Sequence, residues 1–430
     1  MKKRIVAVAA ATAAALLLAG CSSGDGASGG ADAKDITLWL NGGDTPDALR
    51  DYLKTEYADA TGGTLTIEEQ SWTDALAKLT TALPDADNTP DVVEIGNTWA
   101  PTFTNAGAFT DLSDMYDELG GDKLLPSFVE VGSVDDQQFA LPYYFGSRYM
   151  FYRKDVWEKA GITVPTTLAE FNAAAAKLKT DGQSGFYIGG EDWRNGVSWV
   201  FANGGELAVK DGDDWKSTLS DPKTVEGLTQ LQTLFADASL APVTEADSTP
   251  WVNINNNETT GAPEAATIIA PGWAHWSIGD PSPDPKDATK VVNTWNDTTF
   301  GTFVLPGIDG GVAPVFAGGS NIAISAASKK QDSAKELLKI VFSDEYQKML
   351  GENGLGPANL DFASSLGDDQ FATALIDSAA ESKLTPAAPG WAAVEGSGLL
   401  EEFFGKVNGG GDVEALAGEY DKKIDELING

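Results

Sequence analysis

Apolar strands and amphipathic helices alternate over the first hundred residues of the chain. The alternation predicts a strand at 35–40, a helix at 46–62, a strand at 64–69, a helix at 72–83 and a strand at 91–95. This order predicts a parallel sheet with helices on its faces, and such sheets bind ligands at the carboxyl ends of their strands. The loops at 41–44, 70–72 and 96–99 lie at those ends and are the first candidate binding loops.

An aromatic stretch at 139–155 separates this unit from a second α/β unit. Its strand at 148–153 is followed by Asp155, which can start a helix, and a further helix at 167–179 begins with a capping box. Because 430 residues are too many for one ordinary core, we expect two lobes, with the first crossing between them in this stretch. The alternative is a buried strand inside one large domain. The pattern also predicts a return strand at 301–306 and a third crossing at 343–344.

The first 21 residues have the pattern of an export signal. Three basic residues precede an apolar run at 5–18, which is too short to span a bilayer in the ordinary way and ends in Leu-Ala-Gly-Cys, similar to a bacterial lipobox. We expect Cys21, the only cysteine, to become the lipid-carrying N-terminus at the outer face of the cytoplasmic membrane. The alternative is an ordinary secretory signal cleaved after an Ala. Residues 22–34, rich in Gly, Ser, Ala and Asp, predict a flexible tether.

The charge of the chain argues against two classes of partner. The formal net charge is −35, and removal of the three basic residues in the signal leaves 26 basic and 64 acidic residues, a charge of −38. Such a balance disfavours nucleic acid and anionic membrane surfaces as binding partners. It is equally the ordinary means by which an exported protein stays soluble, and it carries no information about the fold.

Catalytic and metal-binding motifs do not emerge from the sequence. The single histidine, His275, rules out zinc sites built from several histidines, and the sequence contains no nucleophile elbow, phosphate loop or dinucleotide fingerprint. Counting carboxylates does not decide against a glycosidase-like acid/base pair, but no motif selects one. The acidic loop at 85–88 lacks the glycine and distal glutamate of a calcium loop. We therefore expect no metal and no cofactor.

Tryptophan is the most informative residue type. Several of the 12 tryptophans fall in predicted loops, where an aromatic face suits the C–H face of a sugar ring and amides or carboxylates can bracket its hydroxyls. The alternative role for each is core packing, which we expect for Trp39, Trp157, Trp199 and Trp295. The loop tryptophans are Trp72, Trp99, Trp193, Trp251, Trp273 and Trp391.

Taken together, the order and spacing of several segments over residues 35–430 resemble the solute-binding proteins of bacterial ABC importers, in the sugar-binding family that includes maltose-binding protein. These segments are 36–43 (ITLWLNGG), 89–95 (TPDVVEI), 140–155, 202–205 (ANGG), 269–273 (IAPGW), 321–328 (NIAISAAS) and 334–346. The resemblance implies an α/β, two-lobe periplasmic-binding-protein-like fold, each lobe a mainly parallel sheet flanked by helices, with three hinge crossings. It places lobe 1 at 35–142 plus 301–343 and lobe 2 at 143–300 plus 344–430.

The resemblance also implies a set of ligand-contacting residues. They are Asn41, Asp44, Gln70, Trp72, Asn97, Trp99, Ser147, Arg148, Asp192, Trp193, Arg194, Trp273, Ser320, Trp391 and Glu395. The loops depart from maltose-binding protein: Gly146 replaces the acidic residue of the crossing strand, and Thr98 and Trp99 replace an acidic-basic pair. The stacking residue Trp273 is retained. A sugar site is thus implied, with maltose itself in doubt, and the overall character is closer to actinobacterial lipoproteins for di- and oligosaccharides.

The resulting hypothesis is a lipid-anchored, monomeric binding protein without catalytic activity. It captures a di- or oligosaccharide by hinge closure and delivers it to ABC permease subunits. One alternative is a secreted glycosidase. The other is an importer component for a cationic ligand such as a polyamine or a peptide, which the acidic balance permits.

Overall fold

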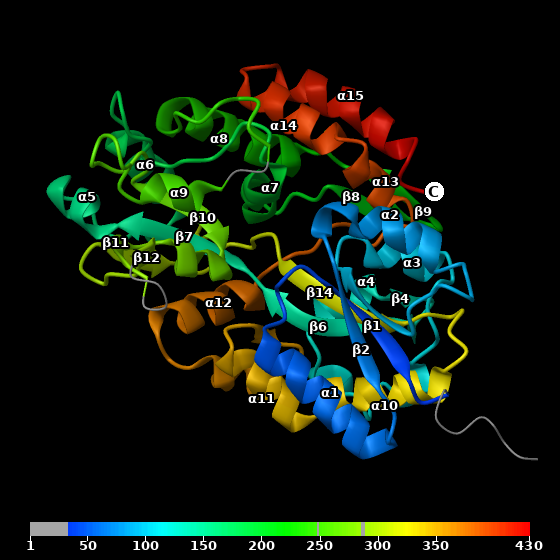
Figure 1. Cartoon of the computed structure of the whole chain (residues 1–430). Coiled ribbons are helices and arrows are strands. Elements are labelled where there is room, and N and C mark those ends of the chain that lie inside the picture. Colours follow the sequence, from blue (N-terminus) through cyan, green and yellow to red (C-terminus); the bar gives the residue numbers. More distant parts are fainter. Residues whose placement is uncertain (1–32, 247–248, 285–288) are drawn as a thin grey trace, which may run out of the picture.

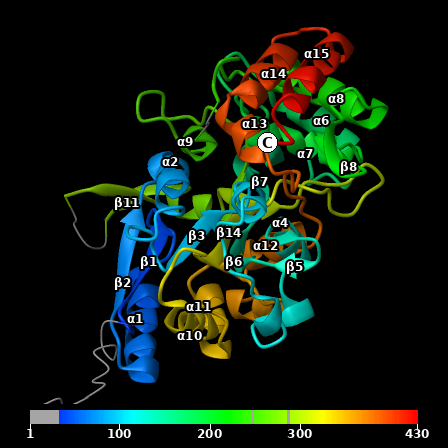
Figure 2. The same ribbon diagram turned by 90° about the vertical axis from the view of Figure 1, so that its right-hand side faces the viewer.

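The computed structural model describes residues 33–246, 249–284 and 289–430. The predicted signal, Cys21 and the tether up to residue 32 lie outside the described residues. Two groups of elements, here called the first and second lobes, lie one above the other in Figure 1, and the side view in Figure 2 places α14 and α15 at one end and α1, α10 and α11 at the other. The α/β class and the two-lobe fold expected from the sequence are confirmed.

The first lobe is built on a mixed sheet ordered β15-β6-β14-β3-β1-β2. Its strands are β1 (Ile36–Asn41), β2 (Leu65–Gln70), β3 (Val92–Gly96), β6 (Ala140–Gly146), β14 (Gly318–Ile324) and β15 (Gly356–Pro357). β1 pairs in parallel with β2 and β3, whereas β14 and β15 run antiparallel to their neighbours. The lobe's helices are α1 (Asp47–Thr61), α2 (Trp72–Ala82), α3 (Ala100–Asn105), α4 (Pro126–Val131), α10 (Gln331–Val341) and α11 (Asp344–Glu352).

The second lobe contains the sheet β10-β7-β13, in which β7 (Arg148–Arg153) is antiparallel to both β10 (Thr267–Pro271) and β13 (Phe300–Phe303). The expectation of a mainly parallel sheet in each lobe is therefore wrong for this sheet. Helices surround it: α5 (Lys154–Lys159), α6 (Leu168–Leu178), α7 (Trp193–Ala202), α8 (Pro222–Ala238), α9 (Pro250–Ile254), α12 (Gln370–Ala380), α13 (Trp391–Gly396), α14 (Leu399–Asn408) and α15 (Val413–Asp425).

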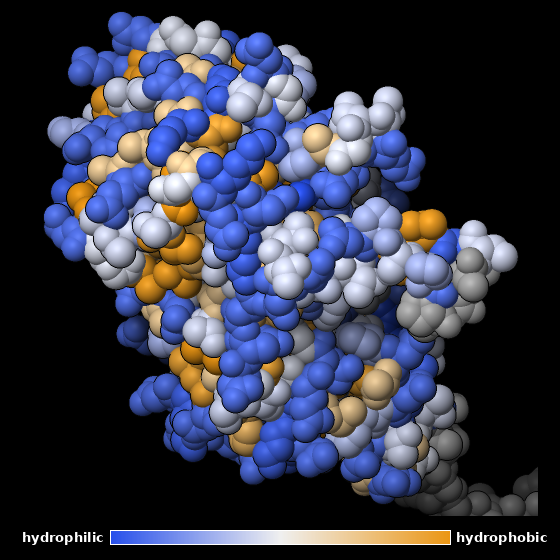
Figure 3. Space-filling view, turned by 90° about the vertical axis from the view of Figure 1, so that its left-hand side faces the viewer, coloured by the Kyte–Doolittle hydropathy of each residue, from blue (hydrophilic) through white to orange (hydrophobic). Residues whose placement is uncertain are grey.

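Short elements complete the described chain. Two-stranded hairpins are formed by β4 (Ser133–Val134) with β5 (Gln137–Gln138), β8 (Ala208–Asp211) with β9 (Asp214–Ser217), and β11 (Asp280–Pro283) with β12 (Val291–Thr294). The 3-10 helices are η1 (Ser113–Met115), η2 (Gly121–Lys123), η3 (Gly272–Ser277) and η4 (Leu360–Leu366). Over these residues, no helix is both long and apolar enough to cross a membrane. The face in Figure 3 is largely hydrophilic with scattered hydrophobic patches, as the charge of the chain leads one to expect.

The first crossing lies within the aromatic stretch, but residues 143–146 belong to β6 of the first sheet, so the predicted boundary after residue 142 is wrong. β6 belongs to the first sheet and β7 to the second, and only Ser147 separates them. The other two crossings lie elsewhere than expected. Residues 301–303 pair with β7 in the second sheet, so the chain returns to the first lobe only at β14, and β15 still pairs with β6 after residue 344. Residues 344–357 thus pack in the first lobe, contrary to the predicted boundary; the remaining boundaries stay a proposal.

Each lobe has its own hydrophobic core, and a third cluster joins them. In the first lobe Leu49, Leu53 and Tyr57 are buried on α1. The second-lobe core includes Trp199, Leu231 and Phe403. The joining cluster contains residues of both β6 and β7, together with others of β10, β13 and α12. Because burying each such side chain contributes about 1.5–3 kcal/mol, the crossing is a packed region and not a free linker.

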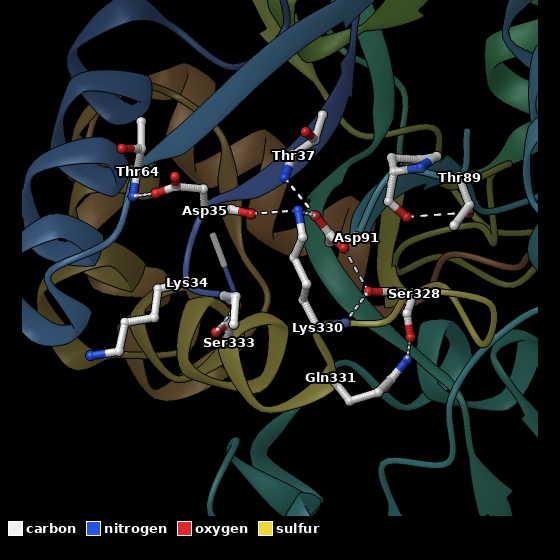
Figure 4. A network of polar contacts seen from close by, with 12 residues as sticks. Lys34, Asp35, Thr37, Thr64, Thr89, Asp91, Ser328, Lys330, Gln331 and Ser333 are labelled. Carbon is white, nitrogen blue, oxygen red and sulfur yellow. Dashed lines mark hydrogen bonds and ion pairs between the residues drawn. The ribbon is translucent and has the colours of Figure 1, made fainter. Parts of the chain in front are cut away.

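A buried carboxylate fixes the amino-terminal edge of the first sheet (Figure 4). Asp91 accepts hydrogen bonds from the backbone N–H of Thr37 at 2.9 Å and from Ser328 Oγ at 2.6 Å, and Lys330 Nζ lies 3.5 Å from it. Lys330 also donates to the backbone oxygen of Asp35 at 2.5 Å. The tether's last residues are held too: Ser333 donates to the backbone oxygen of residue 33, and Tyr57 to that of Lys34. Residues 33 and 34 of the predicted tether at 22–34 are therefore held against the first lobe.

We predict that Asp91→Ala lowers the free energy of unfolding by about 3 kcal/mol, because it leaves buried donors without their charged acceptor. Urea denaturation followed by circular dichroism measures the loss. The matched control is Asp87→Ala. Asp87 is exposed and forms an ion pair with Lys329, which is also exposed, so this substitution should lower the free energy of unfolding by less than about 0.5 kcal/mol. Equal losses for the two variants would contradict a special role for Asp91.

Candidate functional site

A group of polar and aromatic side chains lies at the carboxyl ends of the first-lobe strands, where the sequence predicted a site. Asp44, in the loop after β1, accepts hydrogen bonds from Trp72 Nε1 at 2.9 Å and from the Tyr144 hydroxyl at 3.1 Å. The Trp72 and Trp99 rings lie 5.7 Å apart at 59°. Ser320 on β14 is buried, with its hydroxyl 3.4 Å from that of Tyr144. Burial raises the pKa of Asp44 above its ordinary value.

Glu94, which the sequence analysis did not select, lies beneath this group on β3. Its Oε2 accepts a hydrogen bond from the backbone N–H of Asn41 at 2.7 Å, and the Asn41 side chain donates to the Glu94 backbone oxygen at 3.1 Å. Its Oε1 is buried without a hydrogen-bond partner among the described residues. Burial is the largest cause that raises the pKa of Glu94 to about 7. A charged residue inside the apolar run VVEIG was the available signal.

A second group surrounds the crossing. Arg148, the first residue of β7, donates from Nε to Asn195 Oδ1 at 2.8 Å, and its guanidinium lies 4.6 Å from the centre of the Phe316 ring. Asp192 caps α7 and accepts from the backbone and the side chain of Asn195 at 3.2 and 2.7 Å. Ser147 is buried, and its Oγ has no partner within the described part of the chain. Arg148 and Asp192 are thus held in defined orientations through Asn195.

Two predicted tryptophans belong to the core instead. Trp193 is 1% exposed, its Nε1 donates to Glu401 at 3.0 Å, and its ring packs on Phe316. Trp391 is fully buried. Neither can stack on a ligand in this structure, because both rings are covered by the second-lobe core. Arg194 remains a candidate: it lies over the Trp193 ring and pairs with Glu395, whose second oxygen has no partner among described residues.

The third group is aromatic and lies on η3. Trp273 is 49% exposed, and its ring meets that of Trp251 edge to face at 4.8 Å. Of the tryptophans expected in the core, Trp157 and Trp199 are buried, whereas Trp39 and Trp295 are only partly buried. His275 is held by packing, because its ring stacks on Phe371 at 4.4 Å between ring centres. Burial lowers the pKa of His275. Trp273 is therefore half-exposed, and its role as a stacking residue stays a prediction.

Contacts bring the three groups to the boundary between the lobes. Asn97, after β3, donates to the backbone oxygen of Ala317 at 3.2 Å, next to the strand that passes Arg148. The backbone N–H of Gly272 on η3 donates to Ser147 O at 3.0 Å. Gln70, in contrast, has its side-chain oxygen occupied by Lys78 at 3.0 Å. The first lobe and the crossing supply hydrogen-bonding groups, and η3, which is hydrogen-bonded to the crossing, supplies aromatic side chains of the second lobe.

Another contact joins the lobes at α3 and α13. The backbone N–H of Ala392 donates to Thr102 Oγ1 at 3.2 Å. Beside it lies a crevice of about 690 Å³ lined mainly by apolar residues of both lobes, among them Leu76, Phe103 and Ala393. This crevice is distinct from the polar and aromatic groups above. In the residues described, no group of three or more His, Cys, Asp or Glu side chains is arranged to hold a metal ion.

We predict that Glu94 makes the stability of the protein depend on pH. Its pKa of about 7 in the folded state lies above the unfolded value of 4.5, so the folded state holds the proton more tightly. Stability relative to Glu94→Gln is then greatest below about pH 4.5 and falls as pH rises through 7, by on the order of 3 kcal/mol. Urea denaturation of both proteins at pH 4.5, 6 and 8 measures the difference.

The control for this prediction is Glu226→Gln, a substitution at an exposed position of α8. Its difference from the parent protein should not change with pH. If the Glu94→Gln difference is equally constant, the pKa of Glu94 is the same in the folded and unfolded protein and the prediction is wrong.

Comparison with known proteins gives consistent matches. The model of the bacterial extracellular solute-binding protein family matches residues 42–348. The chain is 34% identical over 407 residues to the diacetylchitobiose binding protein DasA of Streptomyces coelicolor, covering 92% of this chain and 91% of that protein. It is 25% identical over 368 residues to the lactose-binding protein of Rhizobium radiobacter, covering 80% and 78%.

Solved structures share the fold. The sugar-binding protein MalE of Xanthomonas citri superimposes with a TM-score of 0.75 at 20% identity, covering 92% of this chain and 97% of that one. The GacH receptor of Streptomyces glaucescens gives 0.72 at 20% identity, covering 92% and 98%. At such identities these structures show the architecture alone.

Proposed function

Because the chain belongs to the bacterial extracellular solute-binding protein family, we propose that it captures a di- or oligosaccharide outside the cell and delivers it, unaltered, to an ABC importer. The observation that carries this proposal is the open indole face of Trp273, supported by Trp251 and placed at the boundary between the lobes. The fold covers this tryptophan only in part, and a sugar ring has the flat C–H face that suits its exposed portion.

The binding groups divide between the lobes. On the first lobe, Asp44, Trp72 and Tyr144 form one hydrogen-bonded unit whose remaining lone pairs suit sugar hydroxyls. At the crossing, Ser147 contributes a buried hydroxyl without a partner among the described residues. Closure of the lobes would remove water from these groups and strengthen each hydrogen bond. A micromolar dissociation constant requires about 8 kcal/mol, which one stacked ring and several such bonds provide after ordering costs.

The named relatives narrow the choice of sugar. One is a diacetylchitobiose binding protein and another a lactose-binding protein, so β-linked disaccharides come first among the candidates. The relatives named above are binding proteins, and we propose that this chain likewise carries out no catalysis. We propose further that it acts as a lipid-anchored monomer on the outer face of the cytoplasmic membrane, in contact with permease subunits.

We predict that Trp273→Ala weakens binding of the preferred saccharide at least tenfold, because it removes the stacking face. Isothermal titration calorimetry with diacetylchitobiose and lactose, preceded by a thermal-shift screen over sugars, polyamines and peptides, measures the effect. The control is Val252→Ala, an exposed change on neighbouring α9 that should leave affinity within twofold. Unchanged affinity in Trp273→Ala would remove this residue from the site, and turnover of the sugar would replace the proposal with an enzyme.

We predict that Cys21→Ala releases the protein from the membrane fraction of the producing bacterium into the medium, because no thiol remains for lipid attachment. Immunoblotting of membrane and culture fractions measures the distribution. The matched control is Ser22→Ala, which keeps the thiol and should remain with the membrane. A Cys21→Ala protein that stays in the membrane fraction would contradict anchoring through this residue.

A further inference from the structure

The 3-10 helix η3 presents two tryptophans on one side. In such a helix residues i and i+3 lie above one another, and three residues advance about 6 Å. Trp273 and Trp276 have this spacing and are 49% and 60% exposed, whereas Gly272 and Ala274 of the same helix are buried. The two indoles therefore follow one another along the same exposed edge, at a step comparable to the length of one pyranose unit.

The helix is held by its other side chains. His275 Nδ1 lies 2.6 Å from the backbone oxygen of Gly272, and the His275 ring stacks on Phe371 of α12 at an interplanar angle of 21°. Phe371 in turn meets Trp295 edge to face at 4.7 Å. Trp276 also contacts the His275 ring, at 4.7 Å between ring centres, yet it stays 60% exposed, so packing on α12 holds the helix and leaves both indoles accessible.

Trp276 extends over the first lobe. A Cβ atom on Gly354 would lie 3.2 Å from Cζ2 of Trp276, so the indole edge rests on the backbone of the turn before β15. β15 pairs with β6 at Tyr144, the residue whose hydroxyl donates to Asp44. Trp276 thus contacts the turn that leads into β15, the strand that pairs with β6 at Tyr144.

We propose that Trp273 and Trp276 form a two-step stacking ladder for successive rings of one saccharide chain, and that Trp276 sets the minimum ligand length. This inference rests on the proposed function and deepens it, because it names a chain of at least two rings as the ligand. A single exposed tryptophan would accept any sugar ring. A second tryptophan lies one ring length further along, beside the first lobe. It adds affinity only for a saccharide chain that is long enough to contact it.

The test compares Trp276→Ala and Trp273→Ala across ligand length. The probes are N-acetylglucosamine, diacetylchitobiose and the corresponding tri- and tetrasaccharide, titrated calorimetrically into the purified protein. Trp273→Ala should weaken every member that binds. Trp276→Ala should leave the monosaccharide within twofold of the parent protein and weaken the di- and longer saccharides about tenfold, with Trp276→Phe in between. The control is Val291→Ala, a change at a 71% exposed residue of neighbouring β12, which should leave every affinity within twofold.

The outcomes separate this inference from the proposed function. If Trp276→Ala changes no affinity while Trp273→Ala still does, the ladder is wrong and saccharide capture stands. If Trp276→Ala weakens all lengths equally, the residue acts on closure through Gly354 and not by stacking, which also overturns the ladder. If the parent protein binds no member of the series and no other saccharide in the screen, the proposed function itself fails. Unchanged circular dichroism and melting temperature establish that each variant is folded.

Discussion

The single residue between β6 and β7 is the constraint on which the rest of the structure depends. Because β6 lies in the first sheet and β7 in the second, the chain passes from one lobe to the other within Gly146 and Ser147. The return strand β14 runs alongside, and Gly319 there adopts φ +132°, where a Cβ would lie 2.5 Å from the backbone oxygen of Tyr144. This close approach leaves no room for a side chain at Gly319 and sets β14 directly beside the crossing that carries Tyr144, Ser147 and Arg148.

Burying the polar groups at this boundary lowers the free energy of unfolding, yet the sequence contains them. Glu94 and Asp44 are carboxyl groups whose pKa values burial raises, and Ser147 Oγ and Glu94 Oε1 lack partners in the part of the chain that the structure describes. Buried polar groups are ordinarily satisfied, so these two atoms, which lie among the candidate binding groups, fit a place where an external partner can satisfy them. The buried network at Asp91 is the contrast, because several donors of the chain satisfy that carboxylate.

Sequence patterns predicted where helices and strands form better than they predicted which strands pair with one another. The strand at 148–153 and the helix predicted at 46–62 lie within a residue of where periodicity placed them. The strand near 301–306 was recognised too, but an apolar run does not specify which sheet it joins, and it pairs with β7 and not with the first lobe. β15 has two residues and produces no periodic signal. Trp193, Trp273 and Trp391 all have loop-like sequence surroundings, so the sequence did not distinguish them. Tertiary packing buries Trp193 and Trp391 in the core and leaves Trp273 half-exposed.

The division of chemistry between the lobes fits the order of events that capture requires. Stacking on an indole depends little on the orientation of individual hydroxyls, so the exposed aromatic edge of the second lobe can hold a sugar ring before the lobes close. Hydrogen bonds demand defined geometry, and their donors and acceptors lie on the first lobe and at the crossing, where they meet the ligand only on closure. Discrimination between sugars then arises in the closed state, from groups such as Asp44 and Tyr144 that are already oriented by each other. A ligand that stacks but leaves these groups unpaired would close the lobes at the cost of burying them, and this cost is the physical basis of selectivity.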